Sequence, residues 1–406
     1  MRFKKVLMID SLSTIHVGNG ALLDNTYKLC KDFIANDVEV ITADIKPNIS
    51  RFPVLMEDIF SDYAGSIFKK LRFSIKLMFF YIVEFMNAIF FRGSLQFPWS
   101  KRFRDLINAI ERSDVVVSLS GETINDHYYP QMYQRLLTYH LAIIRGKKLI
   151  LFPQSIGPIY KPLSKFLLRV FLGKAQVIIA RDSRSTETAR KLWGGNKVKL
   201  LFCPDVAVTQ VSEPVVLPGI VVDKKVIGLT VSEIPKDEMG YDKNYLPILV
   251  EKIALFFDAE SYQILLMPSN YQHDGVSADY RLSLEARSQL IAKGYNVAIL
   301  PNKIIHPDVY QGMQKNLFIF ISTRMHVGIL ATSACVPTIM INTQHKIRAY
   351  MDLIGMERFV VELDEFDLLI NKFEALIEQH DVVQKKLACE NSKLRDLVVK
   401  TISSLF

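Results

Sequence analysis

The segment Lys148–Pro158, KLILFPQSIGP, joins a continuous apolar run to a turn of polar residues, glycine and proline. The same arrangement recurs where Asp114–Leu119 leads into Ser120-Gly121-Glu122, and where Val177–Ala180 leads into a charged turn. Continuous apolar runs are typical of strands that are covered on both faces, as in a parallel sheet, because a half-exposed strand would alternate apolar and polar residues. Helical stretches separate the runs, so the pattern predicts an α/β fold.

A proline-rich interruption divides the chain into two such series. Residues 204–225 contain prolines at positions 204, 214 and 218 and lose the regular pattern. Apolar runs and helical stretches resume at Val226 and continue to Ile341, before a helical C-terminal region. We therefore predict two Rossmann-like domains with parallel sheets, residues 1–210 and 220–406, facing a central cleft.

The composition is that of a globular protein with an excess of positive charge. Its 406 residues are 50% hydrophobic and 23% charged, with 18 Gly and 16 Pro, which excludes disordered and collagen-like proteins. The formal net charge of +8 favours anionic partners: phosphorylated metabolites, anionic lipid surfaces or nucleic acid. Nucleic acid is disfavoured, because the basic residues are spread out and form no basic-aromatic motif.

The N-terminus and the cysteines predict a cytoplasmic protein. The first apolar run, Val6–Ile9, is too short for the core of a signal peptide. The four cysteines lie far apart and form no CxxC pair, which argues against a disulfide scaffold or a zinc site. We therefore expect a reducing compartment and no metal.

One hydrophobic segment, residues 68–97, stands apart from the strand pattern. It is dense in Phe, Ile, Leu and Met, but Lys76, Glu84 and Asn87 interrupt it, which argues against a membrane-spanning helix. Two alternatives stay open. The segment is either a helix packed between the domains, or an interfacial helix at a membrane surface below basic residues.

Ligands of open parallel sheets bind beyond the carboxyl ends of the strands, so the residues after each apolar run are the candidates. The first such place is His16-Val17-Gly18-Asn19-Gly20, where glycines permit a tight turn with backbone N–H groups near a ligand at a helix start. Gly18 and Asn19 are therefore candidate binding residues. The alternative is a turn that needs glycine for its backbone alone.

The second place, Ser120–His127, combines two carboxylates, an amide and an imidazole after a buried strand. This mixture suits hydrogen bonds to sugar hydroxyls and proton transfer from one of them. The alternative is a helix cap by an Asn or Asp side chain. The candidates are Gly121, Glu122, Asn125, Asp126 and His127.

The third place combines Gln154 and Ser155 with Arg181, which follows the next strand. An arginine at the carboxyl end of a strand can bind a phosphate or carboxylate with two parallel hydrogen bonds, next to the N–H groups of a helix start. The alternative is that Arg181 pairs with Asp182, Glu187 or Asp205.

The fourth place is Ser322-Thr323-Arg324-Met325-His326. If the turn is extended, Arg324 and His326 point the same way, so that a guanidinium and an imidazole face one ligand. Lys346, after the next strand, adds a cation at the same sheet edge. The alternative is that His326 is a core histidine bonded to a backbone carbonyl.

Five short motifs occur in a defined order over about residues 5–360, and together they resemble the polysaccharide pyruvyl transferase family. They are Gln154-Ser155-Ile156-Gly157-Pro158, Arg181–Ser185, Cys203-Pro204-Asp205-Val206-Ala207, Ser322-Thr323-Arg324-Met325-His326, and Val336-Pro337 with His345-Lys346. The resemblance implies a fold like that of GT-B glycosyltransferases. It also implies transfer of the carboxyvinyl group of phosphoenolpyruvate to a sugar, which forms a pyruvate ketal and releases phosphate.

The resemblance places phosphoenolpyruvate on Arg181, Arg324, His326 and Lys346, which suits a donor with both a phosphate and a carboxylate. His326 is then the expected general acid, and Asp126 or Glu122 the expected base, with no cofactor. A cell-surface polysaccharide or its lipid-linked precursor at the inner membrane face is the expected acceptor. A glycosyltransferase that uses a nucleotide-sugar donor, and a non-catalytic sugar-binding protein, are the alternatives.

Overall fold

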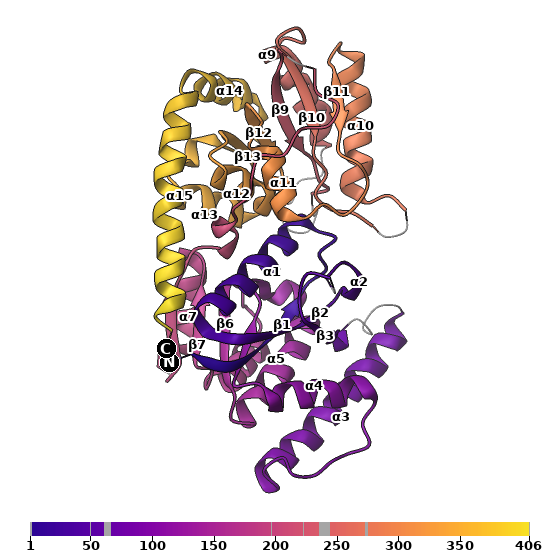
Figure 1. The fold of residues 1–406 in the computed structure, drawn as a ribbon, viewed down its shortest axis with the longest axis vertical. Coiled ribbons are helices and arrows are strands. Elements are labelled where there is room, and N and C mark those ends of the chain that lie inside the picture. The colour runs from indigo at the N-terminus through magenta and orange to yellow at the C-terminus, as the bar shows by residue number, and fades with distance from the viewer. Residues whose placement is uncertain are drawn as a thin grey trace. The chain divides into compact units, whose positions relative to one another are not determined.

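The computed structural model describes residues 2–48, 50–60, 66–195, 197–221, 223–234, 244–272 and 275–405, apart from the side chains of residues 47 and 345. Its contacts divide the chain into two compact units. The first contains residues 1–13, 22–206 and 397–406, and the second contains residues 14–21 and 207–396. Each unit is built around one sheet (Figure 1).

The first unit holds a parallel sheet in the order β3-β2-β1-β4-β6-β7-β8, with β5 paired to β6. All four residues of β4 are buried, as are all residues of β6 after its first, which confirms the inference drawn from the continuous apolar runs. The strands are β1 (Phe3–Ser11), β2 (Ala35–Thr42), β3 (Val54–Glu57), β4 (Val115–Ser118), β5 (Gly121–Ile124), β6 (Lys148–Ile156), β7 (Val177–Ala180) and β8 (Lys199–Phe202).

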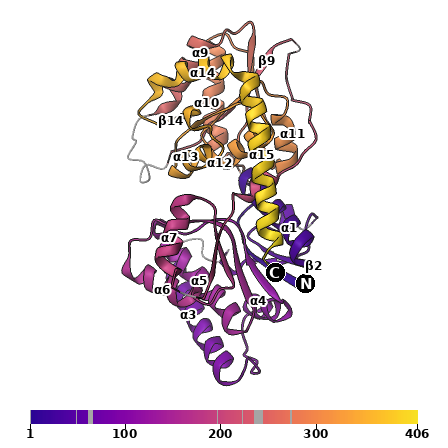
Figure 2. The ribbon, with the colours of Figure 1, turned by 90° about the vertical axis from the view of Figure 1, so that its left-hand side faces the viewer.

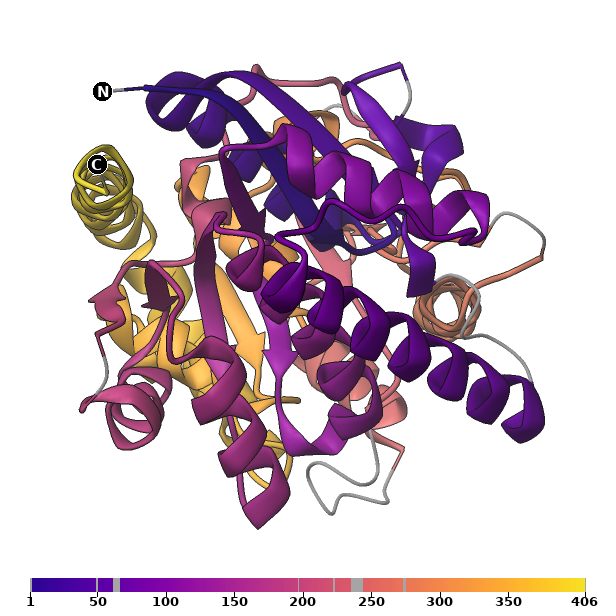
Figure 3. The ribbon, with the colours of Figure 1, turned by 90° about the horizontal axis from the view of Figure 1, so that it is seen from below.

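Helices cover this sheet and complete its core (Figure 2). The helices are α1 (Val17–Leu29), α2 (Ile45–Asn48), α3 (Ile67–Phe90), α4 (Lys101–Arg112), α5 (Tyr129–Ile144), α6 (Pro162–Leu172) and α7 (Ser183–Trp193). The hydrophobic segment 68–97 forms α3 and the extended chain after it, and α3 packs against α5. Figure 3, seen from below, shows α3 along the outside of this unit.

The second unit holds a parallel sheet in the order β11-β10-β9-β12-β13-β14. Its strands are β9 (Lys225–Thr230), β10 (Tyr262–Leu266), β11 (Val297–Ile299), β12 (Ile319–Ser322), β13 (Thr338–Ile341) and β14 (Val360–Val361). Its helices are α9 (Tyr245–Phe256), α10 (Ala278–Ala292), α11 (Pro307–Gln314), α12 (Met325–Ser333), α13 (His345–Leu353), α14 (Leu369–Glu378) and α15 (His380–Ser403).

The two units exchange short segments that the sequence assigned by position alone. Residues 14–21 lie with the second unit, because Val17 N donates to Ser269 O at 2.9 Å and Tyr271 N donates to Ile15 O at 3.0 Å. Residues 397–406, the end of α15 and the residues after it, lie with the first unit. The predicted domains, residues 1–210 and 220–406, are continuous in sequence, whereas each observed unit includes a short segment from the other end of the chain.

Candidate functional site

Arg324 follows the carboxyl end of β12 and occupies the N-cap position of α12, without a capping hydrogen bond from its side chain. Its backbone is extended, with φ −117° and ψ 125°. The hydroxyl of Ser322 fixes this geometry, because it accepts from Arg324 N at 3.1 Å and donates to Arg324 O at 2.8 Å. The local sequence therefore holds Arg324 at a helix start, where backbone N–H groups favour an anion.

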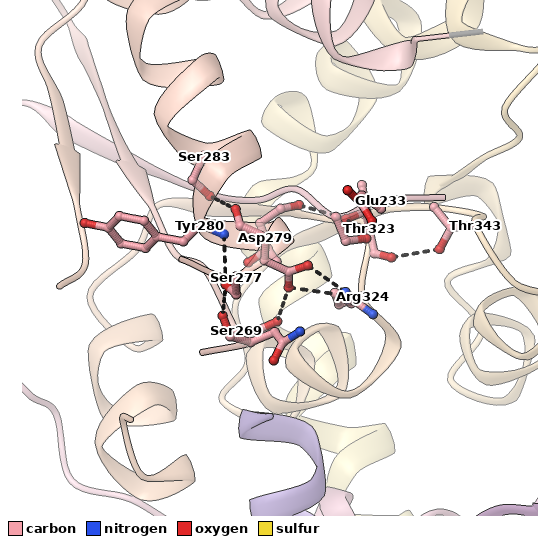
Figure 4. Close-up of polar contacts among 12 residues, drawn as sticks. Glu233, Ser269, Ser277, Asp279, Tyr280, Ser283, Thr323, Arg324 and Thr343 are labelled. Carbon is pink, nitrogen blue, oxygen red and sulfur yellow. Dashed lines mark hydrogen bonds and ion pairs between the residues drawn. The ribbon is translucent and has the colours of Figure 1, made fainter. Parts of the chain in front are cut away.

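A buried carboxylate orients the guanidinium of Arg324 (Figure 4). Arg324 Nη2 donates to Asp279 Oδ1 at 2.6 Å, and Nε donates to Oδ2 at 3.3 Å. The Asp279 side chain is fully buried, whereas that of Arg324 is 37% exposed. Burial raises the pKa of Asp279, and the charge of Arg324 opposes this effect. The pair thus fixes one side of the guanidinium and leaves part of it accessible.

Hydroxyl groups connect the loops that follow β9, β12 and β13 at this edge. Thr323 Oγ1 lies 2.9 Å from Ser232 Oγ, and Thr343 Oγ1 donates to Thr323 O at 2.8 Å (Figure 4). Tyr245 OH donates to Ser232 O at 2.8 Å. These hydrogen bonds therefore connect the loops at the carboxyl ends of three neighbouring strands, next to Arg324.

The first turn of α1 packs directly on His326. A Cβ atom at Gly18 would lie only 2.6 Å from His326 Cβ and 3.1 Å from its Nδ1. Glycine is needed here for this close approach, and Asn19 follows it in the same turn. The partly buried His326 thus faces the first turn of α1, as well as its own helix α12.

His16 belongs to the same group, although the sequence analysis did not select it. Burial, together with the nearby charges of Arg324 and His326, lowers the pKa of His16 to about 4. Its backbone forms an antiparallel bridge with Asn270, which holds it in the second unit. Its position two residues before Gly18, in the same turn after the first strand, could have indicated His16 as a candidate. Two imidazoles and one guanidinium therefore gather at one sheet edge.

Lys346 lies in the first turn of α13, after the strand β13 that pairs with β12. It is partly exposed. The edge thus brings together, from the predicted set, Gly18, Asn19, Arg324 and His326, with Lys346 after the neighbouring strand. No group of three or more His, Cys, Asp or Glu side chains in the described parts of the chain could hold a metal ion.

Arg181 does not resemble Arg324 in its surroundings. Its guanidinium pairs with Asp205, and Nε donates to Ser155 Oγ at 2.8 Å. Both charged side chains are 2% exposed. Arg181 thus forms a buried ion pair inside the first unit, as in the alternative interpretation, and donor binding by this residue stays a prediction. Ser155 is the partner of this arginine.

Asp126 is a buried cap and not an accessible base. Its Oδ2 accepts from Tyr160 N and Lys161 N, both at 2.7 Å, and its Oδ1 accepts from the hydroxyl of Ser164. These groups belong to the start of α6, where unpaired N–H groups need acceptors. The oxygens of Asp126 thus stabilise a helix start, which was the alternative interpretation, and its role as general base stays a prediction.

The other candidates of the first unit divide by exposure. Gln154 is fully buried and its amide donates to Leu119 O. Asn125 caps a short 3₁₀ turn at Asp126–Tyr128, where it accepts from His127 N at 2.9 Å, and it also donates to Glu122 at 3.1 Å.

Two candidates of the first unit retain solvent access, and the buried Gly121 borders open space. Glu122 is partly exposed and His127 is exposed. A Cβ atom added at Gly121 would meet nothing within 4 Å, so open space lies beside this backbone. Glu122 therefore stays the candidate base of this unit.

The structure also shows a buried polar cluster that the sequence analysis missed. Asp10, the residue before the last of β1, has a left-handed backbone conformation with φ 64°, which is uncommon for a residue with a side chain. It accepts from Arg135 at 2.6 Å and from Ser118 at 2.7 Å. Burial raises the pKa of nearby Asp58 to about 6, although the charge of Arg135 opposes it. The cluster lies at the carboxyl end of β1 and β4.

Comparison with known proteins decides the family. A family model described as polysaccharide pyruvyl transferase matches residues 16–345, well over half of the chain. The chain belongs to the polysaccharide pyruvyl transferase family. The match begins at His16 and extends past Arg324 and His326, so it includes the edge of the second sheet described above.

The chain is also distantly similar to the amylovoran biosynthesis protein AmsJ of Erwinia amylovora. It is 19% identical over 412 aligned positions, which cover 95% of this chain and 94% of that protein. At this identity, the comparison does not fix the substrate of this chain.

Solved structures share the fold of this pyruvyl transferase family member. UDP-GlcNAc 2-epimerase from Neisseria meningitidis has a TM-score of 0.56 at 13% identity, with 99% of each chain covered. HepE from Anabaena, solved with UDP and glucose, has a TM-score of 0.55 at 13% identity, with 98% of this chain and 97% of that chain covered. The fold is therefore α/β and GT-B-like, with two Rossmann-like domains.

Proposed function

We propose that this family member transfers the carboxyvinyl group of phosphoenolpyruvate to two hydroxyls of a sugar in a polysaccharide or its lipid-linked precursor. The product is a pyruvate ketal, and phosphate is released. The observation that carries the proposal is the group of cationic and imidazole side chains at the carboxyl edge of the second sheet, in a chain of this family.

The donor suits this edge by charge and size. Phosphoenolpyruvate carries its phosphate oxygen and its carboxylate on the same central carbon, so that both anionic groups fit within a small site. Arg324, held by Asp279, offers the accessible part of its guanidinium to one of them, and Lys346 adds a second cation. The helix starts of α12 and α13 contribute backbone N–H groups to the same edge. Arg181 is left out of this donor set because it is buried against Asp205.

The reaction forms two C–O bonds at the central carbon of the donor and breaks its bond to the phosphate oxygen. One hydroxyl proton of the acceptor is balanced by the proton added to the methylene carbon, which becomes a methyl group. The other leaves with phosphate. The acid that protonates the methylene carbon is His326 in this proposal, and the cations beside it stabilise the developing charge on the phosphate.

His16 adds a second imidazole to this proposal. Its lowered pKa keeps it neutral near pH 7, so it accepts hydrogen bonds or a proton. A bound dianion supplies the opposite charge, which favours a protonated His16. The base that takes a proton from the acceptor stays a prediction from the sequence, at Glu122.

Phosphate release from labelled phosphoenolpyruvate tests the proposal, with lipid-linked sugars as acceptors. His326→Gln should lower kcat by 10²–10⁴-fold, because it removes a general acid. Arg324→Lys should raise KM for phosphoenolpyruvate, because lysine cannot keep the paired hydrogen bonds to Asp279 and an anion. Arg287→Lys, an exposed arginine on the same α10 that carries Asp279, is the matched control and should change neither constant.

Two outcomes contradict the proposal. Release of a nucleoside diphosphate from a nucleotide sugar, with phosphoenolpyruvate left intact, makes the chain a glycosyltransferase. Near-normal ketal formation by a folded His326→Gln variant removes that imidazole from the reaction.

A further inference from the structure

The helix α3 has two faces of opposite character. Its inner face packs on the core of the first unit and includes Phe73, Leu77 and Phe80, which are at most 8% exposed. Its outer face carries large apolar side chains that are at least half exposed. These include Phe68, Leu71, Ile75, Phe79, Ile82 and Phe90, with exposures of 80%, 58%, 62%, 61%, 50% and 65%.

The spacing places these side chains on one stripe. Successive members are mostly three or four residues apart, which keeps them on one side of a helix. The residues of the inner face lie on the opposite side. Isolated exposed apolar residues are ordinary, but a continuous stripe along 24 residues indicates an interaction surface.

The charges of α3 favour an anionic occupant over a second copy of the chain. Lys69, Arg72 and Lys76 are exposed within its first three turns. The single acidic residue of α3, Glu84, is buried and pairs with Arg145. A second α3 would bring the same positive charge to the interface, whereas an anionic lipid surface complements it.

The inner face argues against a spanning orientation, although α3 is long and apolar enough to cross a bilayer. Glu84 accepts from Trp99 Nε1 and from Arg145, and Asn87 Nδ2 donates to Leu95 O at 2.9 Å. A spanning helix would break these contacts and place Glu84 in hydrocarbon, which is costly.

We infer that the outer stripe of α3 docks on an anionic lipid surface, with the helix lying in the plane of the interface. The apolar side chains enter the boundary between headgroups and acyl chains, and the cations of the first turns contact lipid phosphates. This inference goes beyond the transfer reaction and does not depend on the donor.

Trp99 provides a reporter at this surface. Its ring lies 6.0 Å from that of Phe79 on the outer stripe, in an edge-on contact. The chain has two tryptophans, and Trp193 is 1% exposed. Vesicles of phosphatidylglycerol and phosphatidylcholine with brominated acyl chains should therefore quench Trp99 and leave Trp193 unaffected. Phosphatidylcholine vesicles alone should quench much less.

Two variants of the full chain separate the apolar and the charged contributions in flotation with the same vesicles. Leu71→Ser/Ile75→Ser/Ile82→Ser should lower partition at least tenfold, because three exposed apolar side chains leave the interface. Val216→Ser/Leu255→Ser/Val382→Ser, at side chains 89%, 66% and 63% exposed in the second unit, is the matched control. Lys69→Gln/Arg72→Gln should cost about fivefold per cation at low salt and less at high salt.

Several results would overturn the inference. They are the absence of quenching by anionic vesicles, an equal loss of partition in the control variant, and resistance of the bound protein to extraction with alkaline carbonate, which would show a spanning helix. A dimer that the stripe variant abolishes, without any vesicle binding by the wild type, would assign the stripe to a second copy.

Discussion

The contact between Gly18 and His326 gives a direct test of the candidate site, through the substitution Gly18→Ala. The added methyl group would lie 2.6 Å from His326 Cβ, where van der Waals contact needs about 3.6 Å. A Cβ atom does not move when a side chain changes rotamer. The clash is therefore relieved only if the first turn of α1 or of α12 shifts, by about 1 Å.

The expected effect on stability is small and the effect on activity is large. Overpacking costs about 1–3 kcal/mol, and alanine in place of a helical glycine returns up to about 1 kcal/mol. A displacement of about 1 Å at a reacting group can cost about 10²-fold in rate. We therefore expect kcat/KM for phosphoenolpyruvate to fall about 100-fold, while the free energy of unfolding falls by at most about 2 kcal/mol.

The assay combines phosphate release from phosphoenolpyruvate with urea unfolding. Gly194→Ala is the matched control, because its added Cβ would lie at the same 2.6 Å from Arg190 O, at the end of α7 in the first unit. It should lose stability without losing activity. The reasoning is refuted if Gly18→Ala keeps wild-type kcat/KM, or if Gly194→Ala loses activity to the same degree.

Two further predictions concern a carboxylate and an imidazole. Asp126→Ala should lower the free energy of unfolding by about 2–4 kcal/mol, because Tyr160 N and Lys161 N lose their acceptor. Turnover per folded molecule should change little. A stable variant with a 100-fold lower kcat would show a catalytic role instead. His16, with a pKa of about 4 when folded against an ordinary value near 6.5, should stabilise the protein fully above pH 6.5 and progressively less as the pH falls toward 4. Urea unfolding should show about 2 kcal/mol of this loss between pH 7 and pH 5, and His16→Gln should remove that part of the pH dependence; an unchanged slope would place the titration elsewhere.

The positions of the central strands were predicted well from the sequence, because each of them is a continuous run of apolar residues. The run Asp114–Leu119 became β4 at Val115–Ser118, and Val226–Val231 became β9 at Lys225–Thr230. The edge strands β3 and β14 were not predicted. They are two to four residues long, and partner strands and helices stabilise them more than their own sequence does.

Strand limits failed where polar residues found partners in the sheet. The sequence analysis divided Lys148–Pro158 into an apolar strand and a polar turn, and placed Gln154 and Ser155 in that turn as candidate binding residues. The structure continues β6 to Ile156, because the amide of Gln154 bonds to Leu119 O and the hydroxyl of Ser155 to Arg181. These partners come from β4 and β7 regions that local sequence around residue 154 does not reveal.

The proximity of His16 to His326 could not be predicted either, because the contacts that create it join residues far apart in the sequence. Each lies after a different strand of a different sheet, β1 and β12. Hydrogen bonds of residues 15 and 17 to residues 271 and 269 hold the start of α1 in the second unit, and these pairings lie far apart in the sequence. A strand-end rule indicates that a residue is near a ligand edge, but it does not indicate which edge.

Arg181 and Arg324 differ in how much of the guanidinium is accessible. Both follow a parallel strand, both precede a helix, and both pair with a buried carboxylate. The side chain of Arg181 is 2% exposed, whereas that of Arg324 is 37% exposed. A fully buried pair satisfies its own charges, and an arriving anion would have to displace Asp205 at a cost of several kcal/mol. At Arg324 the carboxylate orients the guanidinium and leaves donors at the surface, so an anion can bind without breaking the pair. We therefore expect the accessible part of the guanidinium, and not the position of the arginine after a strand, to decide which of the two binds a donor.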